Sequence, residues 1–339
     1  MTSGTRKLLV ASDKMYRRPP ANLGDGDEEL FADAYSYRTR DSFIFQLGAC
    51  RVSAHSVVYR NGLIVPESAV EARLRRYYQT RYLLKQIVAA RKVRLRSDER
   101  YLLLTDAWST GHFHWFMEVL PKMLLIEHLG ADYVLLLPDT GYVRNVGLKT
   151  ISRLGLDFRD IVMMRENEFY SVPDLYYVPA IAAPGQVNDA VMQRLNRRLV
   201  GDGLSGSRRL YVSRSKAAFR KVVNETELAD FLKDCGFETV YPENSPLTEQ
   251  IELFSQCGTL LGLHGAGLTN AIFMRPSGNV VELRKREPNY GYWHLAESVG
   301  HKYYYYHGHP DSDLSLIGRG CNLMVDIKEL EKVLGGVGS

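Results

Sequence analysis

The second half of the chain alternates short apolar runs with amphipathic stretches. The apolar runs have the length of buried strands and lie at residues 209–213, 238–241, 259–263, 279–283 and 301–306. The segments between them have helical spacing at 225–235, 247–257 and 292–299. Strands separated by helices of this length form a parallel sheet with helices on both faces. The pattern therefore predicts an α/β domain over residues 207–310.

The first half follows a less regular pattern. Strand-like runs occur at 43–46, 52–59, 63–65, 101–105, 133–138, 161–164 and 175–178, and helical spacing occurs at 67–90, 112–129, 143–154 and 188–200. We assign residues 41–200 to a first domain, and the Gly- and Ser-rich run at 201–207 to a linker. Residues 1–40 mix charge with Pro and Gly, so we expect them to be partly disordered. We expect a last helix at 320–336 to pack back on the first domain.

Residues 260–270 have the pattern of a buried strand, a glycine turn and a helix start. Gly265 and Gly267 let backbone amides approach a ligand, and a helix N-terminus favours an anion. His264 adds an imidazole that can donate to a phosphate. Many glycine turns between strand and helix bind nothing, so both interpretations stay open for the turn alone. The order of glycines here differs from a dinucleotide fingerprint, which disfavours a nicotinamide cofactor.

Composition narrows the class of protein. Apolar residues make up 45% and charged residues 24% of the chain, as in a soluble globular protein. A net charge of +4 is too small to indicate nucleic-acid binding, and it suits an anionic small ligand or contact with an acidic membrane surface. The arginine runs at 73–76 and 91–96 are typical of a solvated helix face. Four widely spaced cysteines indicate neither a zinc site nor a disulfide framework.

No stretch of the sequence has the apolar length of a signal-peptide core or a membrane span. We therefore expect a cytoplasmic protein, with peripheral association at the inner face of the membrane as an open alternative. Whether an anchor has been trimmed from the sequence also stays open.

Residues that follow the predicted strands of the second domain should meet in one crevice, because ligands of parallel sheets bind beyond the carboxyl ends of the strands. Ser213, Arg214 and Arg220 follow the first strand, and two guanidinium groups could neutralise a diphosphate without a metal. A surface ion pair is the alternative for Arg214. Asn224 belongs to this site or caps the next helix. Glu282 could accept from the hydroxyls of a ribose or make a structural salt bridge.

A second group of chemically capable residues lies in the first half. His114 and Glu118 stand four residues apart and share one face of a helix, so one could orient the other as an acid–base pair. A histidine among aromatic residues is also typical of a packed core. The spacing His112-x-His114 resembles metal ligation, but no third ligand is evident nearby, so we expect no metal. Trp108 could pack on a sugar ring.

Several of these runs, taken together and in order, resemble glycosyltransferase family 61. They are residues 113–121, 209–214, 220, 224–225, 261–270 and 281–283, and the most specific is His-Gly-Ala-Gly-Leu-Thr-Asn at 264–270. The resemblance covers residues 100 to 310. The family includes protein O-linked N-acetylglucosamine transferases and plant xylan-decorating xylosyl- and arabinosyltransferases. Leu263 departs from the family pattern, and the first hundred residues show no specific match.

The resemblance implies a GT-B architecture with two Rossmann-like domains facing across a cleft. It implies inverting, metal-independent transfer of a hexosyl or pentosyl group from a nucleotide sugar, usually a UDP sugar, to a glycan or glycolipid hydroxyl, as in surface polysaccharide assembly. Carried onto this sequence, the donor-binding residues are Ser213, Arg214, Arg220, Asn224, His264, Gly265, Ala266, Gly267 and Asn270, with Glu282 on the ribose. The acceptor-side candidates are Trp108, His112 and Trp115, although Trp115 could simply fill the core.

Inversion requires a base that takes the proton of the acceptor hydroxyl. We favour Glu118 or His114 for this role, with Asp106 behind them. Two other functions stay open. A metal-dependent GT-A transferase would use Asp25-x-Asp27 or Asp311-x-Asp313, and a non-catalytic module would bind a nucleotide sugar or another anion without turnover. The sugar, the nucleotide, the acceptor, the linkage and the oligomeric state are not predicted.

Overall fold

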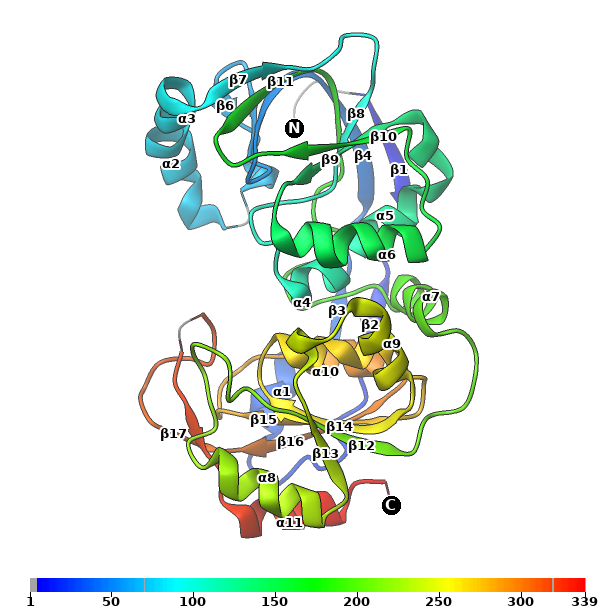
Figure 1. Cartoon of the computed structure of the whole chain (residues 1–339), viewed down its shortest axis with the longest axis vertical. Helices are drawn as coiled ribbons and strands as arrows, with labels where there is room; N and C mark the ends of the chain where they lie inside the picture. Colours follow the sequence, from blue (N-terminus) through cyan, green and yellow to red (C-terminus); the bar gives the residue numbers. More distant parts are fainter. Residues whose placement is uncertain (1–4, 70, 319, 339) are drawn as a thin grey trace. The chain divides into compact units, whose positions relative to one another are not determined.

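The computed structural model describes residues 5–69, 71–318 and 320–338 (Figure 1). The chain divides into two compact units, one made of Met1–Asp13 and Arg40–Ile181, the other of Lys14–Thr39 and Ala182–Ser339. Each unit combines a β-sheet with helices, which confirms the predicted α/β class.

The first unit is built on a mixed sheet. Its strand order is β10-β9-β8-β11-β4-β5-β6, with β1 also paired to β4 and β7 to β11. The strands are β1 (Arg6–Val10), β4 (Ser42–Ser53), β5 (Val58–Arg60), β6 (Leu63–Ile64), β7 (Arg91–Arg94), β8 (Tyr101–Leu103), β9 (Val134–Pro138), β10 (Asp160–Met164) and β11 (Glu168–Tyr177). β8 to β11 pair in parallel, but β4 pairs antiparallel with β11, β5 and β1. The unit therefore differs from the wholly parallel sheet of a Rossmann-like domain.

Helices of the first unit fall where the spacing predicts them. One helical segment runs through α2 (Arg75–Tyr77), the π-helical turn η4 (Tyr78–Tyr82) and α3 (Leu83–Ala89). A second runs through α4 (His112–His114), the π-helical turn η5 (Trp115–Val119), α5 (Leu120–Ile126) and η6 (Glu127–Asp132). A third consists of η7 (Val143–Gly147) and α6 (Leu148–Arg153). Short 3₁₀ turns at η2 (Pro66–Ser68) and η3 (Ala72–Leu74) precede α2.

The second unit contains the predicted parallel sheet. Its strand order is β13-β12-β14-β15-β16, and every pairing is parallel. The strands are β12 (Arg208–Val212), β13 (Phe237–Val240), β14 (Cys257–Leu263), β15 (Asn279–Arg284) and β16 (Lys302–His307), and the helices that link them are α8 (Glu225–Asp234), α9 (Leu247–Ser255), η9 (Ala266–Phe273) and α10 (Gly291–Ser298). The chain moves outward from β12 to β13 and then returns to place β14 on the other side of β12. This reversal is the topological switch point, where such sheets bind ligands.

The boundary between the units differs from the predicted one. Helix α7 (Asp189–Val200), which we placed in the first domain, belongs to the second unit. Its Asn196 is buried and donates hydrogen bonds to the carbonyls of Ile272 at 2.7 Å and Met274 at 2.8 Å. These hydrogen bonds attach α7 to η9 and the residue that follows it. The composition of residues 201–207 suggested a boundary after α7 because it carries no information about such contacts.

The segment at 14–39 belongs to the second unit as well, where the sequence suggested partial disorder. It contains β2 (Lys14–Tyr16), α1 (Glu28–Phe31), η1 (Ala32–Ala34) and β3 (Ser36–Arg38). Phe31 is fully buried, and its ring lies 5.2 Å from that of Trp293. Arg17 forms a two-pronged ion pair with Asp189, with distances of 2.6 and 2.8 Å. The buried Phe31 ring and a partly buried ion pair explain why this charged segment is structured.

The last helix, α11 (Ile327–Gly335), packs on the core of the second unit, where we expected packing on the first domain. Its Leu330 and Leu334 join a core cluster with Leu228 and Leu232 of α8. The Asp326 side chain caps the helix by accepting from the backbone amides of Lys328 and Glu329. The apolar face of α11 is therefore covered by its own unit.

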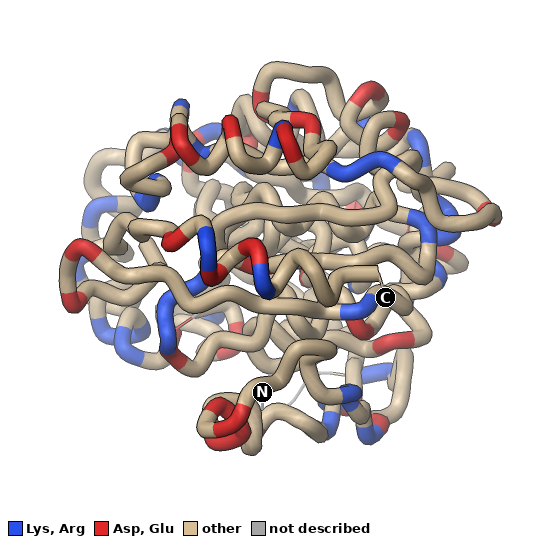
Figure 2. Tube along the Cα trace, turned by 90° about the horizontal axis from the view of Figure 1, so that it is seen from below, with Lys and Arg blue, Asp and Glu red and all other residues tan. Residues whose placement is uncertain are grey.

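Charged residues of both signs are interspersed along the trace (Figure 2). Within the described ranges, no helix has the length and apolar content that crossing a bilayer requires. The four cysteines are free thiols.

Candidate functional site

The switch point of the second unit brings the ends of β12 and β14 together. Val212 pairs with Gly262, so the residues that follow each strand emerge side by side. Gly265 has a φ of 154°, and a Cβ at this position would lie 2.5 Å from Nη1 of Arg214. The glycine turn therefore lies directly against a guanidinium group. A side chain at Gly265 would displace that group, which explains the glycine.

Arg214 and Arg220 are held by backbone carbonyl groups. Arg214 donates to the carbonyl of Arg220 at 2.9 Å and to that of Phe219 at 3.1 Å, while Arg220 donates to the carbonyl of Leu316 at 2.7 Å. Burial, and then the neighbouring charge of Arg220, lower the pKa of Arg214. Considering only the described residues, neither guanidinium has a carboxylate within ion-pair distance. Two neighbouring positive charges without a carboxylate in ion-pair contact can attract an anion.

The positive charge is accompanied by an unsatisfied donor. Nε of Arg220 is buried without a hydrogen-bond partner, and Arg220 adopts a left-handed backbone conformation with φ of 57°. A non-glycine residue in this conformation is uncommon and is often found at functional sites. Both features indicate that the loop is arranged for a ligand and not for its own stability.

His264 is oriented by a buried carboxylate. Nδ1 of His264 pairs with Oε1 of Glu282, the hydroxyl of Tyr303 donates to Oε2 at 2.5 Å, and Nδ2 of Asn289 lies 3.3 Å from Nε2 of His264. Burial raises the pKa of Glu282, but His264, Arg284 and Tyr303 outweigh it and hold the pKa below its ordinary value. Glu282 is therefore ionised and fixes the imidazole.

This arrangement changes the interpretation of Glu282. Only 1% of the residue is exposed, and both carboxylate oxygens already accept hydrogen bonds. A ribose would have to displace His264 or Tyr303 to reach it. The geometry instead favours Glu282 as a positioning residue for His264. The sequence did not reveal this role, because the second hydrogen-bond partner of Glu282 is Tyr303, which lies on the neighbouring strand.

Glu225 was missed in the sequence. It is the first residue of α8, and its Oε1 accepts hydrogen bonds from the hydroxyls of Ser213 and of Tyr211, the latter at 2.9 Å. Its Oε2 is buried without a partner. Ser213 itself is only 2% exposed. The sequence does contain a signal for Glu225, because this residue directly follows Asn224 in one of the runs that carry the family resemblance.

Two of the predicted donor-binding residues have contacts or burial within their own unit. The Asn224 side chain does not cap α8; it donates to the carbonyl of Val325 at 2.8 Å and accepts from the Val325 amide at 3.0 Å. Asn270 lies within η9 and is 1% exposed. Ala266 and Gly267, at the start of η9, are only partly buried. A Cβ at Gly267 would come within 2.6 Å of Val212, so close packing on β12 also requires this glycine.

The first unit gathers the three predicted base candidates on and beside one helical segment. Nδ1 of His114 lies 3.1 Å from Oε1 of Glu118. Burial lowers the pKa of His114, but Glu118 and Asp106 outweigh it and raise the pKa overall. Asp106 accepts from the backbone amide of Trp108 at 2.9 Å and from the Ser109 hydroxyl at 3.0 Å.

Lys122 joins this cluster and was also missed. It is 2% exposed, and burial lowers its pKa while Asp106 and Glu118 oppose that shift. His114, Glu118 and Lys122 are spaced four residues apart, a pattern that places them on one helix face and was visible in the sequence. A cavity of about 140 Å³ opens beside Asp106, with His55, Asp139, Thr140 and Glu166 among its lining residues. Of the cluster, Asp106 lines this cavity.

The acceptor-side candidates separate into two kinds. Trp115 is fully buried and donates from Nε1 to the Thr150 hydroxyl at 2.9 Å, which fits the alternative that it fills the core. Trp108 is only half-buried, and its ring lies 5.1 Å from that of His114. Nδ1 of His112 lies 3.0 Å from the Tyr142 hydroxyl.

Replacing Trp115 with alanine should lower the free energy of unfolding by about 3–5 kcal/mol, because a fully buried tryptophan leaves a large cavity. Replacing the half-buried Trp108 with alanine should cost clearly less. Denaturant unfolding monitored by circular dichroism measures both. Equal losses in the two variants would contradict the burial described for Trp115.

The pair of His114 and Glu118 should make stability depend on pH. The folded-state pKa of His114 is raised, so the pair stabilises the protein fully below about pH 6.5, the ordinary histidine value, and this contribution disappears as pH rises through the folded-state pKa. Replacing Glu118 with Gln should cost up to about 1 kcal/mol at pH 5.5 and less at pH 9. Urea unfolding at both pH values measures the difference. If the loss of unfolding free energy in Glu118→Gln instead grows with pH, the pair is not stabilised by protonated His114.

One aspartate side chain of each Asp-x-Asp motif, Asp27 and Asp311, makes contacts within the protein. Asp27 accepts from the Tyr305 hydroxyl at 2.8 Å and lies 3.1 Å from Arg286. Asp311 accepts from the backbone and the side chain of Asn322 at 2.9 and 2.7 Å. Over the described part of the chain, no three His, Cys, Asp or Glu side chains gather as metal ligands would.

Comparison with known proteins agrees with the geometry of the second unit. A family model described as glycosyltransferase 61 matches residues 112–281, half of the chain, and includes β12, β14 and the glycine turn. EGF domain-specific O-linked N-acetylglucosamine transferase from Rattus norvegicus is 24% identical over 284 residues, which cover 75% of this chain and 53% of that protein. The same-named protein of Gallus gallus is 28% identical over 167 residues, or 46% of this chain and 31% of that protein.

The chain spans about half the length of the rat and mouse relatives that it matches. The match runs from the helical segment that carries His114 and Glu118 into β15. It therefore contains the arginine pair and the glycine turn as well as His114 and Glu118. On the strength of this match, the chain belongs to glycosyltransferase family 61.

Proposed function

We propose that the chain is an inverting, metal-independent glycosyltransferase. It moves a sugar from a UDP sugar to a hydroxyl of a glycan acceptor. The observation that carries this proposal is the pair Arg214 and Arg220, held by backbone carbonyls at the switch point of a parallel sheet. A diphosphate is the anion that suits two adjacent guanidinium groups and a glycine turn. Family membership supports the same conclusion.

On the donor side, we assign the diphosphate to Arg214, Arg220 and the backbone amides that begin η9. These positive groups stabilise the charge that develops as the bond between the sugar carbon and the diphosphate oxygen breaks, with the electron pair leaving on oxygen. His264, held by Glu282, adds a directed imidazole beside the same turn. Because the cationic groups belong to the protein, the leaving group needs no metal.

On the acceptor side, we assign the base to the His114 and Glu118 pair. The acceptor hydroxyl loses its proton to this pair as its oxygen bonds to the sugar carbon from the face opposite the diphosphate, which inverts the configuration. We assign the proton to the imidazole of His114, because Glu118 lies 3.1 Å away and stabilises the imidazolium that forms. A GT-B arrangement of the two units, which family membership suggests, is part of the proposal.

A panel of nucleotide sugars tests the proposal. The relatives are named as N-acetylglucosamine transferases, so UDP-N-acetylglucosamine is tested first, followed by other UDP and non-UDP sugars. UDP at about 100 times its Kd should stabilise the folded chain by roughly 2.7 kcal/mol, visible as a rise in melting temperature. A productive donor should also be hydrolysed slowly without acceptor. Absence of any UDP shift would contradict the proposal, and binding without hydrolysis or transfer would favour a non-catalytic module.

Removing divalent metals should leave transfer unchanged, because the protein's own guanidinium groups neutralise the leaving diphosphate. Initial rates with excess EDTA and with added Mg²⁺ or Mn²⁺ measure this. A metal-dependent GT-A mechanism predicts that EDTA abolishes the activity and that the metal restores it.

A further inference from the structure

The helical segment α2-η4-α3 has two different faces. Its inward side chains Tyr78 and Tyr82 are buried in a cluster with Tyr59 and Phe169 of the sheet. Outward and adjacent side chains are large, apolar and exposed: Tyr77 (48%), Leu84 (63%), Ile87 (47%) and Val88 (76%), beside Leu63 (66%) on β6. We call this the α2–α3 face. The Tyr77 ring also contacts the core, at 5.4 Å from the ring of Tyr78 and 6.0 Å from that of Tyr82. Burial within the unit nevertheless leaves about half or more of each of the five residues exposed, and the core does not account for this apolar area.

The same segment concentrates positive charge. Residues 72–96 contain nine Lys and Arg and no Asp or Glu, although the whole chain carries a net charge of only +4. Arg91 pairs with Glu168, but Arg76, Arg81 and Lys85 are exposed and, as far as the described residues extend, form no ion pair. In Figure 1, α2 and α3 lie at the margin of the first unit's sheet. Basic and apolar side chains therefore share one exposed surface.

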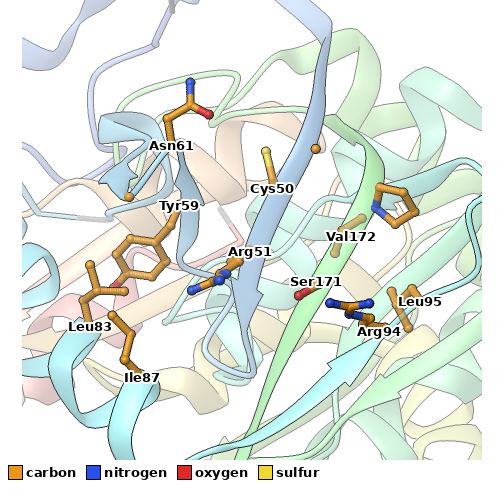
Figure 3. Close-up of a pocket in the computed structure, with 13 residues that line it drawn as sticks. Cys50, Arg51, Tyr59, Asn61, Leu83, Ile87, Arg94, Leu95, Ser171 and Val172 are labelled. Atoms are coloured by element: carbon orange, nitrogen blue, oxygen red, sulfur yellow. The ribbon is translucent and has the colours of Figure 1, made fainter.

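A pocket next to this surface has the same mixed character (Figure 3). It has a volume of about 510 Å³, with Leu83 and Ile87 of the helical segment on one side and Arg51 and Arg94 of the sheet among its other lining residues. Two guanidinium groups and an apolar wall fit a ligand with an anionic head and an apolar tail.

Charge complementarity selects the partner. Nucleic acid binds basic surfaces but needs no exposed aliphatic side chains, whereas an anionic bilayer attracts the basic groups and receives the apolar ones. We propose that the α2–α3 face docks the protein on an anionic lipid bilayer, with Leu84 and Val88 entering the headgroup region and the pocket receiving one phospholipid. This docking is independent of sugar transfer, because no residue of the face belongs to the arginine pair or to the acid–base pair.

Vesicle pelleting of the purified full chain tests the proposal. The protein should pellet with phosphatidylcholine vesicles that contain phosphatidylglycerol and stay in solution with phosphatidylcholine alone. The charge variant Arg76→Glu/Lys85→Glu and the apolar variant Leu84→Ser/Val88→Ser should each weaken binding about tenfold or more.

Matched control variants carry the same kinds of substitution, a charge reversal or the loss of an exposed leucine, outside the α2–α3 face. Lys233→Glu/Lys328→Glu reverses two exposed lysines of α8 and α11, and Leu204→Ser removes an exposed leucine that is 91% accessible. Both controls should pellet like the wild type, and circular dichroism and UDP thermal shift should be unchanged in every variant. Three results would overturn the proposal. The first is equal binding to neutral vesicles, and the second is no binding to anionic vesicles. The third is full binding by the apolar variant with loss of binding only in the charge variant. The last result would indicate a general polyanion site instead.

Discussion

Replacing Arg214 with alanine should abolish the UDP-induced rise in melting temperature and lower kcat/KM by about 10²–10³-fold. The guanidinium lies against Gly265 and next to Arg220, with no carboxylate partner in the described structure, so its charge is available to the diphosphate. Removing one preorganised group that stabilises developing charge costs about this much in other enzymes. Steady-state kinetics and thermal shift with UDP measure the two effects.

The fold of the Arg214 variant should survive. The substitution loses two hydrogen bonds to backbone carbonyls but also removes the repulsion with Arg220, so the free energy of unfolding should change by no more than about 1–2 kcal/mol. Arg214→Lys keeps a charge without the planar fork and should recover part of the binding. Arg208→Ala, which removes an exposed partner of Glu238, serves as the control and should bind UDP normally. A full UDP shift in Arg214→Ala would remove the arginine from the site.

Replacing Glu118 with Gln, or His114 with Ala, should lower kcat by about 10²–10⁴-fold and leave UDP binding intact. The two side chains are 3.1 Å apart and lie in the first unit, whereas the arginine pair belongs to the second. The double variant should be little worse than either single variant, because both remove the same proton transfer. Kinetics at saturating donor, combined with UDP thermal shift, separate loss of chemistry from loss of binding.

The assignment of the base has a clear contrary outcome. If Glu118→Gln, His114→Ala and Asp106→Asn each keep turnover within a few-fold of the wild type, the base lies elsewhere. Glu71→Gln changes the carboxylate partner of the exposed Arg73 and should leave kinetics unchanged.

The sequence predicted the second unit better than the first, for a physical reason. Strands such as β14 and β15 are buried on both faces, so they appear as continuous apolar runs separated by helices. β4 is a single strand of twelve residues that pairs antiparallel with β11, yet its alternating burial made it look like separate short strands. Pairing partners so distant in sequence leave no local signal.

The candidate site shows the same division. Arg214 and His264 could be predicted because they directly follow apolar strands at the switch point. The role of Glu282 could not, since it depends on the register that places Tyr303 on the neighbouring strand beside it. The burial of Trp115 follows from packing against α6, which helical spacing alone does not reveal.

The assignment of the donor site is tested most directly by a crystal structure of the protein with UDP bound. We predict that the diphosphate lies within hydrogen-bond distance of the Arg214 guanidinium and of the backbone amides at Gly265 and Ala266, at the carboxyl ends of β12 and β14. UDP bound elsewhere, or a diphosphate that contacts neither arginine of the pair, would contradict the account.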